Sequence, residues 1–174
     1  EKAGLADAGD DARLLLESCL GKSRTEIFLS ADSPVSFDQQ LHYRKLIDCR
    51  KKRQPVAYIL GQCEFWSLPF YVTPDVLIPR PETEFLIDRV LSLAKGVNLR
   101  SGRILDLCCG SGVIAVVLAK EIGEKIVALD ISAGALGVAK RNADYNGVAS
   151  AIDFVQANLL SALLLKQQFS LVVS

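Results

Sequence analysis

The feature that most constrains this chain is a strand, a glycine-containing turn and an apolar helix in direct succession. The strand is "RILDL" at residues 103–107, the turn is "CCGSG" and the helix is "VIAVVLAKEI". A second strand, "KIVALD", comes next, then a helix that Gly147 ends, and the strands "AIDFV" and "FSLVVS". Strands that alternate with helices at these lengths predict βαβ units and a parallel sheet.

The turn has the sequence form of a loop that holds a cofactor. Gly110 and Gly112 allow the backbone to approach a ligand closely and to present amide groups at a helix N-terminus. Asp130 ends the next strand, near the roughly 20-residue offset at which a carboxylate can accept hydrogen bonds from ribose hydroxyls. The sequence therefore predicts a nucleoside-containing cofactor at this loop.

The residues around the turn favour one cofactor over another. The dinucleotide fingerprint G-x-G-x-x-G asks for glycine where this chain has Cys108 and Ala115. Asp106, just before the turn, would repel a phosphate and suit a cationic ligand. S-adenosylmethionine (AdoMet) carries a sulfonium and no phosphate. AdoMet is therefore favoured, and a dehydrogenase that binds a nicotinamide dinucleotide remains the weaker alternative.

The two adjacent thiols in the turn raise the question of sulfur chemistry. A cysteine at a helix N-terminus can have a lowered pKa and react. However, the five cysteines (19, 49, 63, 108 and 109) show no C-x-x-C spacing, so neither a disulfide framework nor a metal site is predicted. We interpret Cys108 and Cys109 as small packing residues, with Cys108 in the place of a glycine provided that its φ stays negative.

The residues before this α/β pattern predict helices and a hairpin. "DDARLLLESCLG" predicts a helix that ends at Gly21, and capping boxes at Ser23 and Ser36 predict the starts of two more. The basic run "RKKRQP" is interpreted as a solvated helix end, with a surface for an acidic partner as the alternative. Residues 62–78 predict a hairpin or two short strands, and Pro81 predicts another helix start.

Composition bears on partners and location. Twenty basic and twenty acidic residues cancel, which gives no support for a general attraction to nucleic acids or membrane surfaces. No apolar run of about 18 residues and no signal peptide is present, so we expect a cytoplasmic protein. We further expect no contact with a membrane, no direct contact with nucleic acid, and a monomer.

Three segments together resemble one family. The sequence is similar to the HemK/PrmC family, the release-factor glutamine N5-methyltransferases, in "PVAYILGQCEFWSLPFYVTPDVLIPRPETE" (55–84), "ILDLCCGSGVIAVVLA" (104–119) and "VALDISAGALGVAKRNADYNG" (127–147). The stretch "IPRPETE" favours the release-factor branch over the related enzyme that acts on a ribosomal protein. The resemblance implies AdoMet-dependent methylation of the glutamine side-chain amide in the GGQ motif of peptide chain release factors.

The resemblance also implies a fold and a domain order. We expect an α/β, Rossmann-like AdoMet-dependent methyltransferase fold, partial with about four parallel strands, and a small N-terminal helical domain. The expected parts are a release-factor-binding helical domain at 1–60, a β-hairpin linker at 61–80 and an AdoMet-binding domain at 81–174.

The family's cofactor-binding residues transfer onto matching positions. Asp130 is implied to bind the ribose, and residues 80–84 are implied to lie over the cofactor pocket, with helix capping as their alternative role. Family members have Gly-Thr at positions 108 and 109 and Ser-Asp at 157 and 158, so we expect weakened but not abolished cofactor affinity. The other implied cofactor-binding residues are those of the loop and of the adenine site: Cys108, Cys109, Gly110, Ser111, Gly112, Asn158 and Leu159.

The acceptor site is not assigned to any residue of this chain. In the family, the strand that matches "FSLVVS" is followed by Asn-Pro-Pro-Tyr, whereas the sequence given ends at Ser174. We therefore expect a piece of a longer protein that is inactive alone. Two alternatives stay open: a methyltransferase that acts on amino groups of nucleic-acid bases, and a non-catalytic module that binds AdoMet or a release factor.

Overall fold

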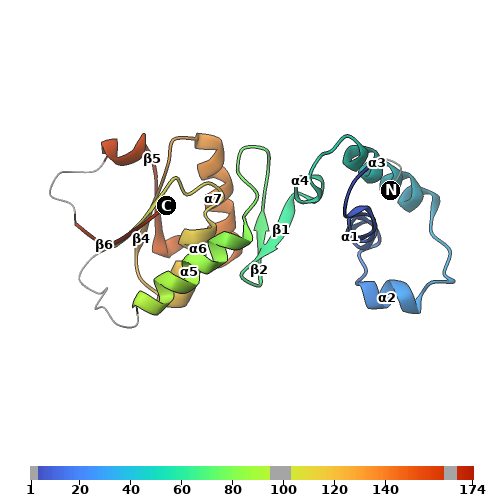
Figure 1. The fold of residues 1–174 in the computed structure, drawn as a ribbon, viewed down its shortest axis with the longest axis horizontal. Helices are drawn as coiled ribbons and strands as arrows, with labels where there is room; N and C mark the ends of the chain where they lie inside the picture. Colours follow the sequence, from blue (N-terminus) through green and yellow to red (C-terminus); the bar gives the residue numbers. More distant parts are fainter. Residues whose placement is uncertain (1–3, 95–102, 163–167) are drawn as a thin grey trace. The chain divides into compact units, whose positions relative to one another are not determined.

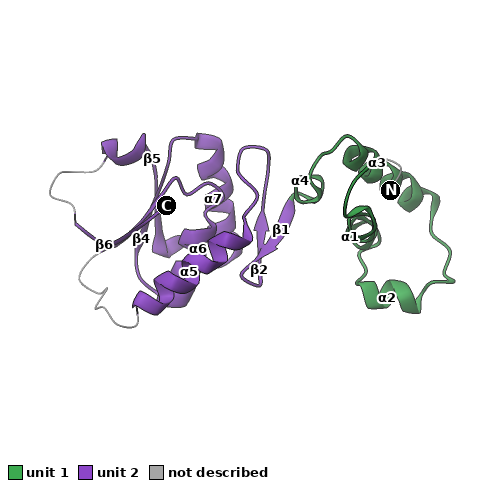
Figure 2. Ribbon diagram, viewed as in Figure 1, with its two compact units in different colours: residues 1–61 green, residues 62–174 purple. Residues whose placement is uncertain are grey.

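The computed structural model describes residues 4–94, 103–162 and 168–174, in two compact units (Figures 1 and 2). Unit 1 is Glu1–Gly61 and contains helices only, whereas unit 2 is Gln62–Ser174 and contains both sheets and the remaining described helices. Among the helices of the described residues, none combines the length and the apolar character needed to cross a membrane.

Helices of unit 1 begin and end at capping residues that the sequence shows. Both predicted capping boxes are confirmed: the Ser23 and Ser36 hydroxyls accept from the backbone N–H groups of Glu26 and Gln39, whose side chains accept in return. Gly21, with φ of 62°, ends the first helix as predicted. The four helices are α1 (Ala8–Leu20), α2 (Arg24–Leu29), α3 (Phe37–Lys51) and α4 (Val56–Leu60).

The interior of unit 1 is small. Leu15 is the one buried residue within residues 4–61. Polar contacts join α1 to α3: Arg50 Nε donates to Asp11 Oδ2 (2.7 Å), and the Tyr43 hydroxyl donates to the Ala12 carbonyl (3.1 Å). Unit 1 is thus held by capping and by a few polar contacts around a single buried leucine.

Unit 2 contains the predicted parallel sheet. Its four strands lie in the order β5-β4-β3-β6, and every neighbouring pair is parallel. The arrangement confirms the expected partial Rossmann-like α/β fold, and the strands fall where the sequence predicted them. They are β3 (Arg103–Leu107), β4 (Ile126–Asp130), β5 (Ile152–Gln156) and β6 (Phe169–Val173).

Three helices pack against one face of this sheet. They are α5 (Pro81–Ala94), α6 (Val113–Ile122) and α7 (Ala133–Tyr145), and they form a single apolar core with Ile104, Ile126 and Ile152. Strand side chains alternate between faces, so Leu105, Val127 and Leu129 form a separate cluster on the opposite face. Because residues 115–119 of α6 are all buried, this helix is apolar nearly all round. Two short 3-10 helices, Ala149–Ala151 and Leu159–Ala162, flank β5.

The predicted hairpin is also present. Strand β1 (Gln62–Phe65) pairs antiparallel with β2 (Leu68–Tyr71), and Phe65 lies opposite Leu68. The two-residue turn between them, Trp66–Ser67, has φ of 54° at both positions. Such turns favour asparagine and glycine, so this turn depends on support from neighbouring elements.

Candidate functional site at the carboxyl edge of the sheet

The parallel sheet brings the predicted site residues to one edge. Because neighbouring parallel strands run in the same direction, the loops after β3, β4 and β5 leave the sheet on the same side. The chain passes from β3 to β4 on one side and later returns to β6 on the other, so the order reverses beside β3. Ligands of open α/β sheets bind in the crevice at such a reversal, and the loop formed by residues 108–112 (the glycine loop) lies there.

Internal hydrogen bonds give the glycine loop its shape. The Gly112 N–H donates to the Cys109 carbonyl (2.7 Å), and the Gly110 N–H donates to Asp130 Oδ2 (2.8 Å). These bonds correct the expectation that both glycine amides would face a ligand: the Gly112 amide closes the loop on itself, and the Gly110 amide holds the loop to Asp130 of β4. What Gly110 offers instead is open space: a Cβ built there would meet nothing nearer than the Cys108 carbonyl oxygen, at 4.0 Å.

Gly112 has a different role. A Cβ at this position would lie 2.9 Å from the Cβ of Ala139 in α7, closer than real side-chain atoms approach. Its φ of 78° is also in the left-handed region. Gly112 therefore allows α7 and the start of α6 to pack closely beneath the loop.

The expectation for the backbone of Cys108 is wrong. Its φ is 59° rather than negative, and its side chain is exposed. The loop needs a left-handed residue at this position, and an L-residue with a side chain pays roughly 1–2 kcal/mol there. Cys109 differs: it is buried, and burial raises its pKa well above the ordinary value for a thiol. A thiol of that kind is inert, which supports a packing role.

Asp106 is wholly buried beneath the loop. Its Oδ2 accepts from the Ala115 N–H (3.1 Å) in the first turn of α6, whereas Oδ1 has no partner among the described residues. Burial, together with a smaller contribution from the charge of Asp130, raises the pKa of Asp106 to about 7. The carboxyl is therefore about half protonated at neutral pH, so its charge discriminates between ligands less strongly than the sequence suggested. The residue fixes where α6 begins.

Asp130 is held in a defined orientation at the end of β4. Its Oδ2 accepts from Gly110, and its Oδ1 accepts from the Ser132 N–H (2.9 Å). An ionised carboxylate has about four lone-pair sites, so each oxygen retains capacity for a further donor. The geometry thus leaves a fixed, partly exposed acceptor beside the glycine loop.

An apolar surface lies next to Asp130. The Ala157 N–H donates to the Asp130 carbonyl (3.0 Å), which brings the segment with Asn158 and Leu159 beside β4. Leu159 is 59% exposed, and Ile131, directly after Asp130, is 65% exposed. The sequence reasoning missed Ile131, although an isoleucine between a strand-ending acid and the N-cap Ser132 is a detectable signal.

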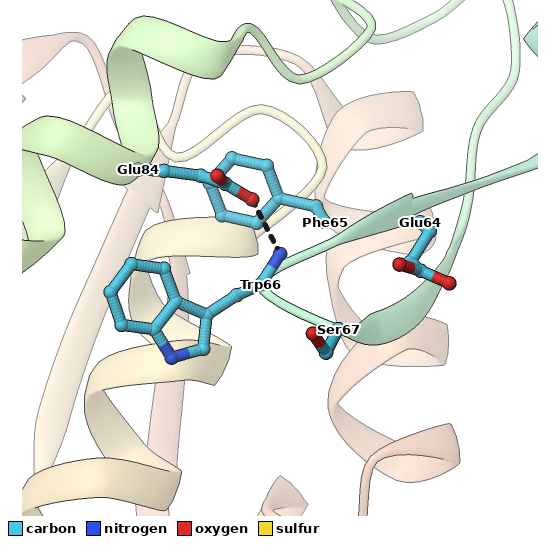
Figure 3. A pocket seen from close by; sticks show the side chains of 5 residues that line it. All are labelled: Glu64, Phe65, Trp66, Ser67 and Glu84. Carbon is cyan, nitrogen blue, oxygen red and sulfur yellow. Dashed lines mark hydrogen bonds between the residues drawn. The ribbon is translucent and has the colours of Figure 1, made fainter.

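Glu84, the last residue of the segment 80–84, contacts the hairpin turn. Glu84 Oε1 accepts from the Trp66 N–H (2.8 Å) and lines a pocket at the hairpin turn with residues 64–67 (Figure 3). The Trp66 indole donates to Glu121 (3.1 Å), in the last turn of α6, whereas the glycine loop precedes the first turn. Glu84 therefore supports the strained turn, and the implied place of residues 80–84 over the cofactor pocket stays a prediction.

Comparison with known proteins identifies the family. The family model of the PrmC N-terminal domain matches residues 1–61, and that of a methyltransferase domain matches residues 104–174. The release factor glutamine methyltransferase of Salmonella typhimurium is 39% identical over 165 residues, which cover 94% of this chain and 58% of that protein. The chain belongs to the HemK/PrmC family.

Other members of the family match comparably. The Chlorobaculum tepidum protein of the same name is 40% identical over 87% of this chain and 53% of its own length. The Coxiella burnetii protein is 47% identical over 76% of this chain and 48% of its own length. This chain thus spans about half the length of the curated relatives that it matches.

Proposed function

We propose that this chain is the cofactor-binding portion of a release factor glutamine methyltransferase. It would bind AdoMet at the glycine loop, and a glutamine amide of a release factor would accept the methyl group. The observation that carries the proposal is the 39% identity over 94% of the chain to a relative of that name. We place this activity in the cytoplasm and in a monomer.

The geometry of the carboxyl edge fits AdoMet. The open space at Gly110 leaves room for the ligand, and Asp130 would accept hydrogen bonds from the ribose hydroxyls. Ile131 and Leu159 would contact the apolar faces of the adenine, with Asn158 at its edge. AdoMet, when bound, supplies a methyl group on a sulfonium to a nucleophile. The residues of this chain hold and orient it.

The acceptor explains why orientation matters. The nitrogen of a side-chain amide is a weak nucleophile because its lone pair is delocalised into the carbonyl. Methylation of such a nitrogen therefore depends on holding it in line with the methyl group. The 174 residues contain no Asn-Pro-Pro-Tyr sequence, so we assign cofactor binding, and not the acceptor site, to the residues of this chain.

Unit 1 offers a surface for the protein partner. A pocket of about 580 Å³ lies among α1, α2 and α3 and is lined largely by apolar groups, including those of Leu16, Ile27 and Phe28. Phe28 and Leu29 are 79% and 78% exposed. Exposed apolar side chains beside a pocket are typical of protein-binding surfaces. We propose that this surface binds the release factor.

Cofactor binding is tested by calorimetry with S-adenosylhomocysteine, and with NAD as the competing ligand. Asp130→Ala is expected to weaken binding about 100-fold, because it removes a charged acceptor of ribose hydroxyls. Asp153→Ala is the matched control, since Asp153 is paired with Arg103 on the surface (2.9 Å). Uptake of NAD without uptake of S-adenosylhomocysteine would overturn the proposal.

The substrate is tested with the full-length gene product and labelled AdoMet. Label is expected in a release factor and not in a variant whose GGQ glutamine is replaced by alanine. Preferential labelling of DNA or RNA would instead support a base methyltransferase. Binding without turnover on any of these substrates would support a non-catalytic module.

A further inference from the structure

A buried asparagine connects the hairpin to the glycine loop. Asn142, in α7, is wholly buried, and its side chain makes three hydrogen bonds. Its Oδ1 accepts from the Tyr71 N–H (2.7 Å), and its Nδ2 donates to the Tyr71 carbonyl (3.0 Å). The same Nδ2 donates to the carbonyl of Ser111 in the glycine loop (2.8 Å). One side chain thus holds two segments that lie about forty residues apart in sequence.

The bonds from Asn142 to Tyr71 pair backbone groups on the outer edge of the hairpin. Strand β2 pairs with β1 on one edge only, and Tyr71 lies opposite Gln62. On its other edge, Asn142 bonds both main-chain groups of Tyr71, and Asn146 Nδ2 donates to the Pro69 carbonyl (3.0 Å). Asn142 in α7 and Asn146 at its C-cap therefore bond the backbone groups that a third strand would otherwise pair with.

The same face of α7 also supports the glycine loop. Ala139 lies one turn before Asn142, and it is the residue that leaves no room for a Cβ at Gly112.

Two further side chains of α7 contact the hairpin. Arg141 lies over the ring of Tyr71, with its Cζ 3.5 Å from the ring centroid, and Tyr145 packs edge-on against that ring (5.1 Å between ring centroids). The hairpin is thus fixed to α7 by side-chain contacts as well as by backbone groups.

From these contacts we infer that Asn142 is a positioning residue that couples the glycine loop to the hairpin, so that cofactor affinity depends on hairpin contacts. The inference rests on the proposed function, because it assigns the cofactor to this loop. Asn142 contacts the Ser111 carbonyl, which is part of the loop's own backbone. Loss of this bond leaves a buried carbonyl without its donor and frees the loop to adopt other conformations.

Coupling of this kind is reciprocal. If the hairpin affects cofactor affinity through Asn142, then the bound cofactor stabilises the hairpin to the same extent. The hairpin amides are therefore a reporter of ligand binding at a distance from the ligand.

The inference is tested by the same substitution at two neighbouring asparagines. Asn142→Ala removes the bonds to both Tyr71 and Ser111. Asn146→Ala removes the bonds to the Pro69 and Asn142 carbonyls, neither of which belongs to the glycine loop, and leaves the Asn142 side chain in place. Both variants are expected to lower the melting temperature. Asn142→Ala is expected to weaken binding of S-adenosylhomocysteine about tenfold, which corresponds to one lost buried hydrogen bond, and Asn146→Ala to change it less than twofold. Equal losses in both variants would overturn the inference.

A second measurement needs no variant. In the wild-type chain, saturation with S-adenosylhomocysteine is expected to slow hydrogen exchange of the Tyr71 amide about tenfold. Unchanged exchange at Tyr71 with slowed exchange at Gly112 would overturn the inference.

A third measurement separates failure of the inference from failure of the proposed function. Without ligand, Asn142→Ala is expected to speed exchange of the Gly112 amide, and Asn146→Ala to leave it unchanged. If the wild type binds no S-adenosylhomocysteine, the proposed function fails, and this comparison still tests the coupling. If Gly112 exchanges at the same rate in both variants, the coupling fails whatever the ligand.

Discussion

The two units of this chain are stabilised in different ways. Within residues 4–61 a single residue is buried, and hydrogen bonds of capping side chains stabilise the helix starts. In the described part of unit 2, one apolar core joins three helices to four strands. The difference suggests that unit 2 builds its site from its own packing, whereas unit 1 leaves Phe28, Leu29 and Phe37 available for contact with a partner.

The largest expected effect contrasts two leucines. Leu118→Ala in α6 removes a wholly buried side chain and is expected to lower the free energy of unfolding of unit 2 by about 3 kcal/mol. Leu29→Ala removes an exposed side chain in unit 1 and is expected to change stability by less than about 0.5 kcal/mol. Urea unfolding followed by fluorescence of Trp66, the single tryptophan, measures unit 2, and circular dichroism measures both units. Comparable losses would contradict the contrast.

An effect of comparable size concerns pH and arises in unit 2. The pKa of Asp106 is about 7 in the folded state and about 4 when unfolded, so the folded state binds more protons between these values. The contribution of Asp106 to stability is therefore fully present below pH 4 and is lost as the pH rises through 7. The total change is on the order of 2–4 kcal/mol.

The pH effect is measured as a difference. Asp106→Asn keeps the shape and one acceptor but cannot ionise, so unfolding free energies of wild type and variant should diverge in favour of the variant as the pH rises from 4 to 8. Carboxyl groups far from Asp106 contribute equally to both profiles and cancel. Parallel pH profiles would show that Asp106 keeps its ordinary pKa.

A smaller effect is expected in the glycine loop. Cys108→Gly relieves a left-handed conformation at a side-chain-bearing residue, and is expected to raise stability by about 1 kcal/mol. Cys109→Gly is the matched control: it removes a buried side chain and should lower stability. Thermal unfolding of the two variants measures both changes. A destabilised Cys108→Gly would show that the thiol makes contacts that outweigh the backbone strain.

The smallest effect tests the dependence of unit 1 on local bonds. Ser36→Ala removes the N-cap of α3 and is expected to cost about 1 kcal/mol. Ser132→Ala removes the equivalent N-cap of α7, where packing against the sheet also holds the helix. Helix content by circular dichroism should fall in Ser36→Ala and remain in Ser132→Ala. The reverse result would show that unit 1 has more tertiary support than its burial suggests.

Sequence signals and tertiary contacts determined different parts of this protein. Capping boxes, helix-ending glycines and the alternation of strands with helices act over a few residues, so α1, α2 and α3, the four strands and the position of the glycine loop could be predicted, whereas α4 (Val56–Leu60) was not. The positive φ of Cys108, the pKa of Asp106, the contact of Glu84 with the hairpin turn and the bonds of Asn142 could not. Each depends on groups distant in sequence, because burial and hydrogen-bond partners exist only once the sheet and α7 have brought those groups together.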